Sequence, residues 1–185
     1  MTVKLREGDM GPTARRGLVI LNTGDGKGKT TAALGVMMRA WGRDMKVIMY
    51  QFIKASRMRL GEHRAAERMG VTIRPMGRGL TSSSPDLEED RRLARDCWQK
   101  AKKEIESGEF DIVILDELTY PLSYEWIDLQ EVLSTLGGRP PGQHVIITGR
   151  RAPEGLIEFA DLVTEMRSVK HPFPQGVKGQ PGIEF

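Results

Sequence analysis

The chain has a single cysteine, few aromatic residues and no long apolar run among its 185 residues. Because Cys97 has no partner in the chain, the sequence excludes an intramolecular disulfide and a thiolate-rich zinc or iron–sulfur site, and we expect a buried helix thiol. No stretch approaches the roughly 20 apolar residues that cross a bilayer, and residues 1–16 lack the apolar centre of a secretory signal. These absences predict a cytoplasmic protein that does not contact a membrane.

The chain also lacks a block of like charges. Its 28 Lys and Arg residues exceed its 25 Asp and Glu residues by a formal charge of +3, and the basic residues are scattered along the sequence. Nucleic-acid binding usually needs a clustered basic face with aromatic residues for base stacking, and only 6% of the residues here are aromatic. We therefore expect no nucleic-acid partner, while the mild excess of positive charge is compatible with a smaller polyanion.

The strongest positive signal is a glycine-rich stretch between an apolar run and a segment with helical periodicity. Its sequence is Gly24-Asp25-Gly26-Lys27-Gly28-Lys29-Thr30-Thr31. Glycines let backbone N–H groups converge on an anion, and a helix N-terminus adds partial positive charge. Lys29 can reach phosphate oxygens, and the Thr30 hydroxyl can hold magnesium. The stretch predicts a phosphate-binding loop (P-loop) in which residues 24–31 bind ATP, and Lys29 and Thr30 also serve catalysis.

This loop is a variant. The common pattern has a glycine where this chain has Thr23, and Lys27 adds a second lysine inside the loop. The alternative interpretation is a glycine-rich turn that binds nothing. We disfavour it because the strand, the helix, the lysine and the hydroxyl all agree with phosphate binding.

Apolar runs and helix-period segments alternate along the rest of the chain, without an internal repeat. This order is typical of an α/β fold of the P-loop NTPase type, with a RecA-like, mostly parallel sheet and helices on both faces. We expect a flexible arm over residues 1–16 and a single nucleotide-binding domain over residues 17–185. Ser84 is predicted to cap a long helix with Pro85 in its first position. The predicted strands are residues 18–21, 47–52, 71–76, 112–115, 145–148 and 162–166, and the apolar faces of two helices are Ala33, Leu34, Met37, Ala40 and Trp41, and Leu87, Ala94, Trp98, Ala101 and Ile105.

Two acids follow the apolar strand at residues 112–115. In parallel α/β sheets the ligand lies beyond the carboxyl ends of the strands, and Asp116 and Glu117 stand at such an end. Either acid could hold magnesium directly or through water, and either could instead cap the following turn. Arg150 follows a neighbouring strand, where it could reach the triphosphate or remain an exposed surface residue.

Residue spacing does not identify the reaction. His63, His144 and His171 make no nucleophile–base pair and no metal-ligand spacing, so we expect structural or solvated side chains. A P-loop ATPase, in which Glu117 orients water, and a small-molecule kinase both remain open. A protein that binds a nucleotide without turning it over is a third interpretation.

Several segments together resemble the P-loop class of corrinoid adenosyltransferases. The similarity runs in order from about Gly17 to Phe185. It is carried by residues 23–33, Gln51-Phe52-Ile53-Lys54, Leu115-Asp116-Glu117-Leu118-Thr119-Tyr120, Val145-Ile146-Ile147-Thr148-Gly149-Arg150, Val169-Lys170-His171 and Gly176-Val177-Lys178.

The resemblance implies transfer of the adenosyl group of ATP to the cobalt(I) of a reduced corrinoid, with release of triphosphate. ATP would be the co-substrate, and Mg²⁺ or Mn²⁺ would be held by Thr30 with Asp116 or Glu117. Members of this family generally form homodimers and receive electrons from a flavoprotein, so both are expected here. The corrinoid is expected against the loop after the third strand, at Arg78, Gly79, Leu80 and Thr81, where this chain has Leu80 and Ser82 in place of the aromatic residues of the family.

Overall fold

A single six-stranded sheet organises the protein. The computed structural model describes residues 16–55, 57–79 and 86–184, so the predicted N-terminal arm lies almost entirely outside the described residues. The strand order is β3-β2-β4-β5-β1-β6, and every neighbouring pair is parallel. The strands are β1 (Val19–Thr23), β2 (Val47–Ala55), β3 (Thr72–Gly77), β4 (Ile112–Asp116), β5 (His144–Thr148) and β6 (Leu162–Glu165).

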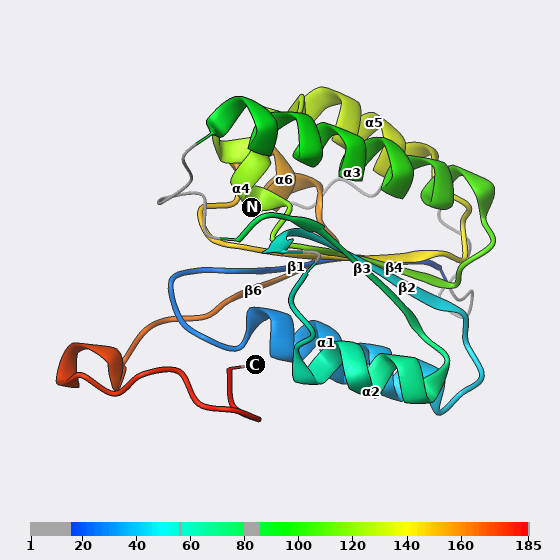
Figure 1. Ribbon diagram of the computed structural model, residues 1–185. Helices are drawn as coiled ribbons and strands as arrows, with labels where there is room; N and C mark the ends of the chain where they lie inside the picture. Colours follow the sequence, from blue (N-terminus) through cyan, green and yellow to red (C-terminus); the bar gives the residue numbers. More distant parts are fainter. Residues whose placement is uncertain (1–15, 56, 80–85, 185) are drawn as a thin grey trace.

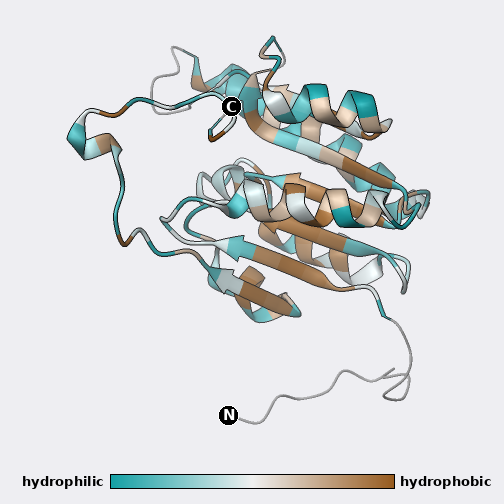
Figure 2. Ribbon diagram, turned by 90° about the horizontal axis from the view of Figure 1, so that it is seen from below, coloured by the Kyte–Doolittle hydropathy of each residue, from teal (hydrophilic) through white to brown (hydrophobic). Residues whose placement is uncertain are grey.

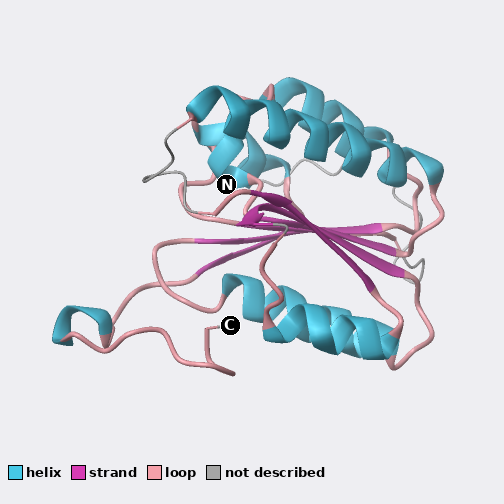
Figure 3. Ribbon diagram, in the orientation of Figure 1, coloured by secondary structure: helices cyan, strands magenta, loops and turns pink. Residues whose placement is uncertain are grey.

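Helices cover both faces of this sheet, which confirms the predicted α/β class (Figure 1; Figure 3). One face carries α1 (Lys29–Trp41) and α2 (Gly61–Met69). The opposite face carries α3 (Leu87–Ser107) and α5 (Leu129–Gly138), together with the short helices α4 (Thr119–Ser123) and α6 (Glu154–Phe159). A 3₁₀ turn, η2 (Phe173–Gln175), lies in the C-terminal segment. No helix among the described residues is long and apolar enough to span a bilayer.

Burial on both faces explains the continuous apolar runs of the central strands (Figure 2). Successive side chains of a strand point to opposite faces. In β2, Ile48 and Tyr50 pack with Trp98 on the α3 side, and Met49 packs with Met37 on the α1 side. Each central strand therefore joins two cores.

The structure corrects three details of the sequence prediction. Asp86, not Ser84, is the N-cap residue of α3, and its carboxylate accepts a hydrogen bond from the Glu89 N–H at 3.1 Å. Leu87, predicted to face inward, is 57% exposed because it begins the helix beyond the edge of the core. Trp41, predicted on the apolar face of α1, is 47% exposed at its last turn, whereas Ala33, Met37 and Ala40 of the same predicted face are buried.

Candidate active site

The glycine-rich loop leaves the carboxyl end of β1 and joins the N-terminus of α1. Gly28 is the N-cap residue of α1 with φ 111°, and Gly24 has φ 94°, a left-handed conformation that glycine adopts without strain. The Gly26 N–H donates to the Met166 carbonyl at 2.6 Å. A Cβ at Gly24 or Gly26 would lie 2.5 or 2.7 Å from the Met166 oxygen. These glycines thus permit both the loop conformation and its close packing against the segment after β6.

Lys29 is held inside this loop and is only 6% exposed. Its Nζ donates to the carbonyl oxygens of Gly24 at 2.8 Å and Gly26 at 2.7 Å. Burial lowers the pKa of Lys29, and the negative charge of Glu117 partly opposes this shift. The carbonyl oxygens of the loop therefore accept hydrogen bonds from the Lys29 ammonium group, and phosphate oxygens could accept from it in the same way.

Asp116, at the end of β4, connects the loop helix to the sheet. Its carboxylate is fully buried, and its Oδ1 accepts hydrogen bonds from the Thr30 hydroxyl at 2.8 Å and the Thr148 hydroxyl at 2.7 Å. Its Oδ2 accepts from Gln51 Nε2 at 3.2 Å. Because β5 lies beside β4 in the sheet, Thr148 at the end of β5 is placed to reach Asp116 at the end of β4. Asp116 thus fixes the Thr30 hydroxyl.

A histidine supports this network from α2. His63 Nε2 lies 2.7 Å from Gln51 Oε1, and His63 Nδ1 lies 3.1 Å from the Leu60 N–H. Nε2 donates to Gln51 Oε1, since Gln51 uses its amide nitrogen for Asp116, while Nδ1 also lies 2.9 Å from the Met58 carbonyl oxygen. Of the two roles that the sequence left open, structural or solvated, these contacts favour the structural one, in which His63 positions Gln51.

Glu117 faces the cavity from a strained position. Its φ is 65°, and its N–H donates to the Thr148 hydroxyl at 2.9 Å. Within the described part of the chain, its buried Oε2 has no hydrogen-bond partner. Burial, reinforced by the neighbouring charge of Asp116, raises the pKa of Glu117 to about 7. A buried carboxylate with a free oxygen suits a bound cation.

The oxygen donors at this point fit magnesium. Thr30, Asp116 and Glu117 offer hydroxyl and carboxylate oxygens, the hard ligands that Mg²⁺ prefers. Among residues 16–55, 57–79 and 86–184, no group of three or more histidine, cysteine or acidic side chains could hold a metal ion by itself. A protein-bound Mg²⁺ commonly has one or two carboxylates and completes its coordination with water and substrate phosphates, so the sparse donor set agrees with this ion.

A cavity of about 560 Å³ opens in front of these groups, a size typical of small-molecule sites. Most of the predicted ATP ligands line it, whereas Gly24 and Asp25 do not, and Asp116 lies behind Thr30. Arg150 is exposed and also borders it. The lining residues are Gly26, Lys27, Gly28, Lys29, Thr30, Thr31, Leu34, Lys54, Gly61, Glu62, Ala65, Glu117, Tyr120, Arg150, Gly182, Ile183 and Glu184.

Several of these residues were not predicted to form the site. Lys54 forms an ion pair with Glu62 of α2, and its Nζ lies 4.0 Å from Asp116 Oδ2. Its position at the end of β2 was the available signal, because strand ends meet at the ligand edge of the sheet. Nothing in the sequence placed Gly182 to Glu184 at the site, because they lie in a segment without periodicity, far from the loop in sequence.

The start of the predicted corrinoid loop lies at another part of this edge. Gly79 has φ 118° and donates its N–H to the Ile53 carbonyl at 2.8 Å. Arg78 and Gly79 border a small cavity with Trp126, whose ring stacks on Tyr124 with centroids 5.0 Å apart. Leu80 and Thr81 lie outside the described residues. The described loop residues are thus beside an aromatic pair that the sequence did not single out.

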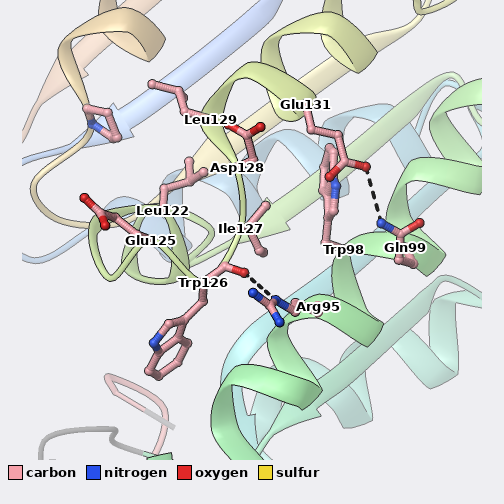
Figure 4. Close-up of a pocket in the computed structure, with 11 residues that line it drawn as sticks. Arg95, Trp98, Gln99, Leu122, Glu125, Trp126, Ile127, Asp128, Leu129 and Glu131 are labelled. Carbon is pink, nitrogen blue, oxygen red and sulfur yellow. Dashed lines mark hydrogen bonds between the residues drawn. The ribbon is translucent and has the colours of Figure 1, made fainter. Parts of the chain in front are cut away.

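A larger cavity, of about 800 Å³, lies on the opposite helical layer between α3 and the start of α5 (Figure 4). Glu125, Asp128 and Glu131 border it, and Arg95 uses its guanidinium to donate to the Trp126 carbonyl at 2.9 Å. Acidic side chains repel phosphate, and the glycine-rich loop does not reach this cavity. The smaller cavity is therefore the candidate nucleotide site.

Comparison with solved structures supports the fold. The flagellar accessory protein FlaH from Methanocaldococcus jannaschii superposes with a TM-score of 0.52 over 84% of this chain and 73% of that chain. The two sequences are 14% identical, so this similarity concerns the fold alone.

Comparison with known sequences identifies the family. The corrinoid adenosyltransferase of Escherichia coli K12 is 45% identical over 92% of this chain and 86% of its own length. Corrinoid adenosyltransferase CobA of Salmonella typhimurium is 43% identical over the same shares. The profile of the ATP:corrinoid adenosyltransferase family BtuR/CobO/CobP matches residues 15–185. Because the profile covers nearly the whole chain and both relatives are at least 43% identical to it over 92% of its length, the chain belongs to this family of ATP:corrinoid adenosyltransferases.

Proposed function

We propose that the protein transfers the 5′-deoxyadenosyl group of ATP to the cobalt(I) of a reduced corrinoid and releases inorganic triphosphate. The observation that carries the proposal is the cavity in which the P-loop, Lys29 and Glu117 meet, in a chain that belongs to this family. The reaction belongs to the formation of adenosylated cobalamin.

The electron balance of this reaction suits the residues present. The cobalt(I) electron pair forms the bond to the ribose 5′ carbon, and the bond from that carbon to the triphosphate oxygen breaks, with its electrons leaving on triphosphate. The attacking atom carries no proton, so the step needs no general base. The residues of the cavity have to align the two reactants and stabilise charge on the leaving group. Lys29, Lys27, Arg150 and the loop N–H groups are suited to this.

Magnesium has a place in the proposal. Thr30 and Glu117 would hold the ion, and Asp116 would fix Thr30 from behind through the observed hydrogen bond. When bound, Mg²⁺ neutralises charge on the phosphate oxygens. Mn²⁺ prefers the same oxygen ligands and is an alternative.

The orientation of ATP distinguishes this proposal from phosphate transfer. We infer that the variant loop grips the triphosphate so that the ribose carbon, and not the terminal phosphate, faces the acceptor. The corrinoid would lie at the carboxyl edge of β2 and β3, against Arg78, Gly79, Leu80 and Thr81. The proximity of Arg78 and Gly79 to Trp126 supports an apolar surface there.

The proposal extends to the setting of the enzyme. It includes a homodimer and a reducing flavoprotein, both from the family resemblance, and no nucleic-acid or membrane partner. It also includes one catalytic domain over residues 17–185 after a short arm. A reaction that consumes ATP and a strongly reduced metal requires a reducing compartment that contains ATP, so we place the enzyme in the cytoplasm.

A product analysis tests the reaction. The protein is incubated with ATP, Mg²⁺ and chemically reduced corrinoid, and the visible spectrum is followed while the phosphate products are separated. We expect the spectrum of an alkylated corrinoid and an equal amount of triphosphate. ADP with free phosphate would instead identify an ATPase, and ADP with a phosphorylated acceptor would identify a kinase.

A lysine substitution tests the nucleotide site. Lys29→Ala removes the buried ammonium group of the loop, and we expect it to abolish ATP binding in calorimetry. Lys103→Ala, at an exposed position on α3, is the matched control and should bind ATP as the unmodified protein does. Unchanged affinity in Lys29→Ala would contradict the assignment of the loop.

A further inference from the structure

The C-terminal segment returns to the phosphate loop. After β6 the chain passes through η2 and ends on the same side of the sheet as α1 (Figure 1). A turn in which the Glu184 N–H donates to the Gln180 carbonyl at 3.0 Å holds the last described residues. Gly182, Ile183 and Glu184 form one wall of the nucleotide cavity. An acidic side chain is thus brought to a site whose proposed ligand is a polyanion.

Glu184 uses this position to pair with the extra lysine of the loop. Its carboxylate forms an ion pair with Lys27 Nζ, and the Glu184 side chain is 23% exposed. Lys27 pairs with Glu184 of the C-terminal segment, whereas Lys29 donates to the loop carbonyls. The two lysines of the loop therefore have different partners, and only that of Lys27 carries a negative charge.

We propose that Glu184 is an internal competitor of the triphosphate chain for Lys27. The inference rests on the proposed function only in taking this cavity as the triphosphate site. The Glu184 carboxylate and a phosphate oxygen compete for the same ammonium group, so ATP binding displaces Glu184, and Glu184 recovers Lys27 as triphosphate leaves. Glu184 thereby weakens the hold on the leaving triphosphate and limits inhibition by this product.

The expected size of the effect follows from the exposure of the pair. Partly exposed ion pairs contribute modestly, so loss of the competing carboxylate should tighten triphosphate binding about two- to fivefold at low ionic strength. Salt screens such interactions, and the gain should shrink when the ionic strength is raised to ~1 M.

Calorimetric titration with inorganic triphosphate tests the proposal without corrinoid or turnover. Glu184→Gln keeps the shape of the side chain and removes its charge. We expect tighter binding of both triphosphate and ATP. Glu158→Gln, which neutralises an exposed acid of α6, is the matched control and should leave both affinities unchanged.

A double-variant cycle separates competition for Lys27 from general repulsion. In the Lys27→Gln background, Glu184→Gln should have no further effect on triphosphate affinity. A gain of equal size in that background would overturn the proposal, since Glu184 would then act on the anion directly. Weaker ATP binding in Glu184→Gln with unchanged triphosphate binding would also overturn it, because Glu184 would then contact the nucleoside. Failure of adenosyl transfer in the unmodified protein would leave these titrations interpretable.

Discussion

Replacing Glu117 by glutamine should change how stability depends on pH. The carboxyl is buried beside Asp116, and one of its oxygens has no hydrogen-bond partner within the described residues. Its folded-state pKa of about 7 lies above the ordinary value of 4.5. The folded protein therefore binds a proton more tightly than the unfolded chain, and stability falls as pH rises from about 4.5 to 7. Glu117→Gln cannot titrate and removes this dependence.

The magnitude follows from the shift. A rise from 4.5 to about 7 corresponds to about 3 kcal/mol once the group is ionised in both states. At pH 5 most of this loss of unfolding free energy is absent, because Glu117 is still protonated in the folded protein, and at pH 8 nearly all of the loss is present. The gain in unfolding free energy from Glu117→Gln should thus be about 2 to 3 kcal/mol larger at pH 8 than at pH 5.

Urea unfolding at both pH values, without metal or nucleotide, measures this difference. Glu158→Gln is the control, since an exposed acid should respond almost equally at the two pH values. With Mg²⁺ and ATP added, the unmodified protein should become more stable than Glu117→Gln, because the metal requires the ionised carboxylate of Glu117. Equal stabilisation by Glu117→Gln at pH 5 and pH 8 would refute the argument that burial raises the pKa of this group.

Two further substitutions test the support of the site. Asp116→Asn keeps an acceptor for the Thr30 and Thr148 hydroxyls but opposes the Gln51 amide with a second donor. We expect a loss of about 1 to 3 kcal/mol in unfolding free energy, and ATP binding that no longer responds to Mg²⁺ in titrations with and without chelator. Gly149→Ala would place a Cβ 2.0 Å from the Thr119 hydroxyl at a φ of 141°, and should cost about 2 to 5 kcal/mol in urea unfolding. Gly138→Ala, where nothing lies within 4 Å, should be nearly neutral, and similar losses in both glycine variants would contradict the steric explanation.

The sequence by itself determined the architecture and the phosphate loop. Apolar runs without alternation require burial on both faces, and helix-period segments between them require a parallel sheet with crossover helices. Glycines, a lysine and a threonine between a strand and a helix identify an anion site because each meets a local requirement. These inferences depend on short-range periodicity and spacing, which a sequence displays directly.

Only the tertiary structure decided which distant groups meet. The sheet order places β5 between β4 and β1, so Thr148 bridges Asp116 and Glu117, and Glu117 faces the cavity while Asp116 lies behind Thr30. The C-terminal segment returns to the glycine-rich loop and brings Glu184 into contact with Lys27, although most of the sequence separates the two residues. Such contacts depend on strand order and on the path of an aperiodic segment, and neither leaves a periodic pattern in the sequence.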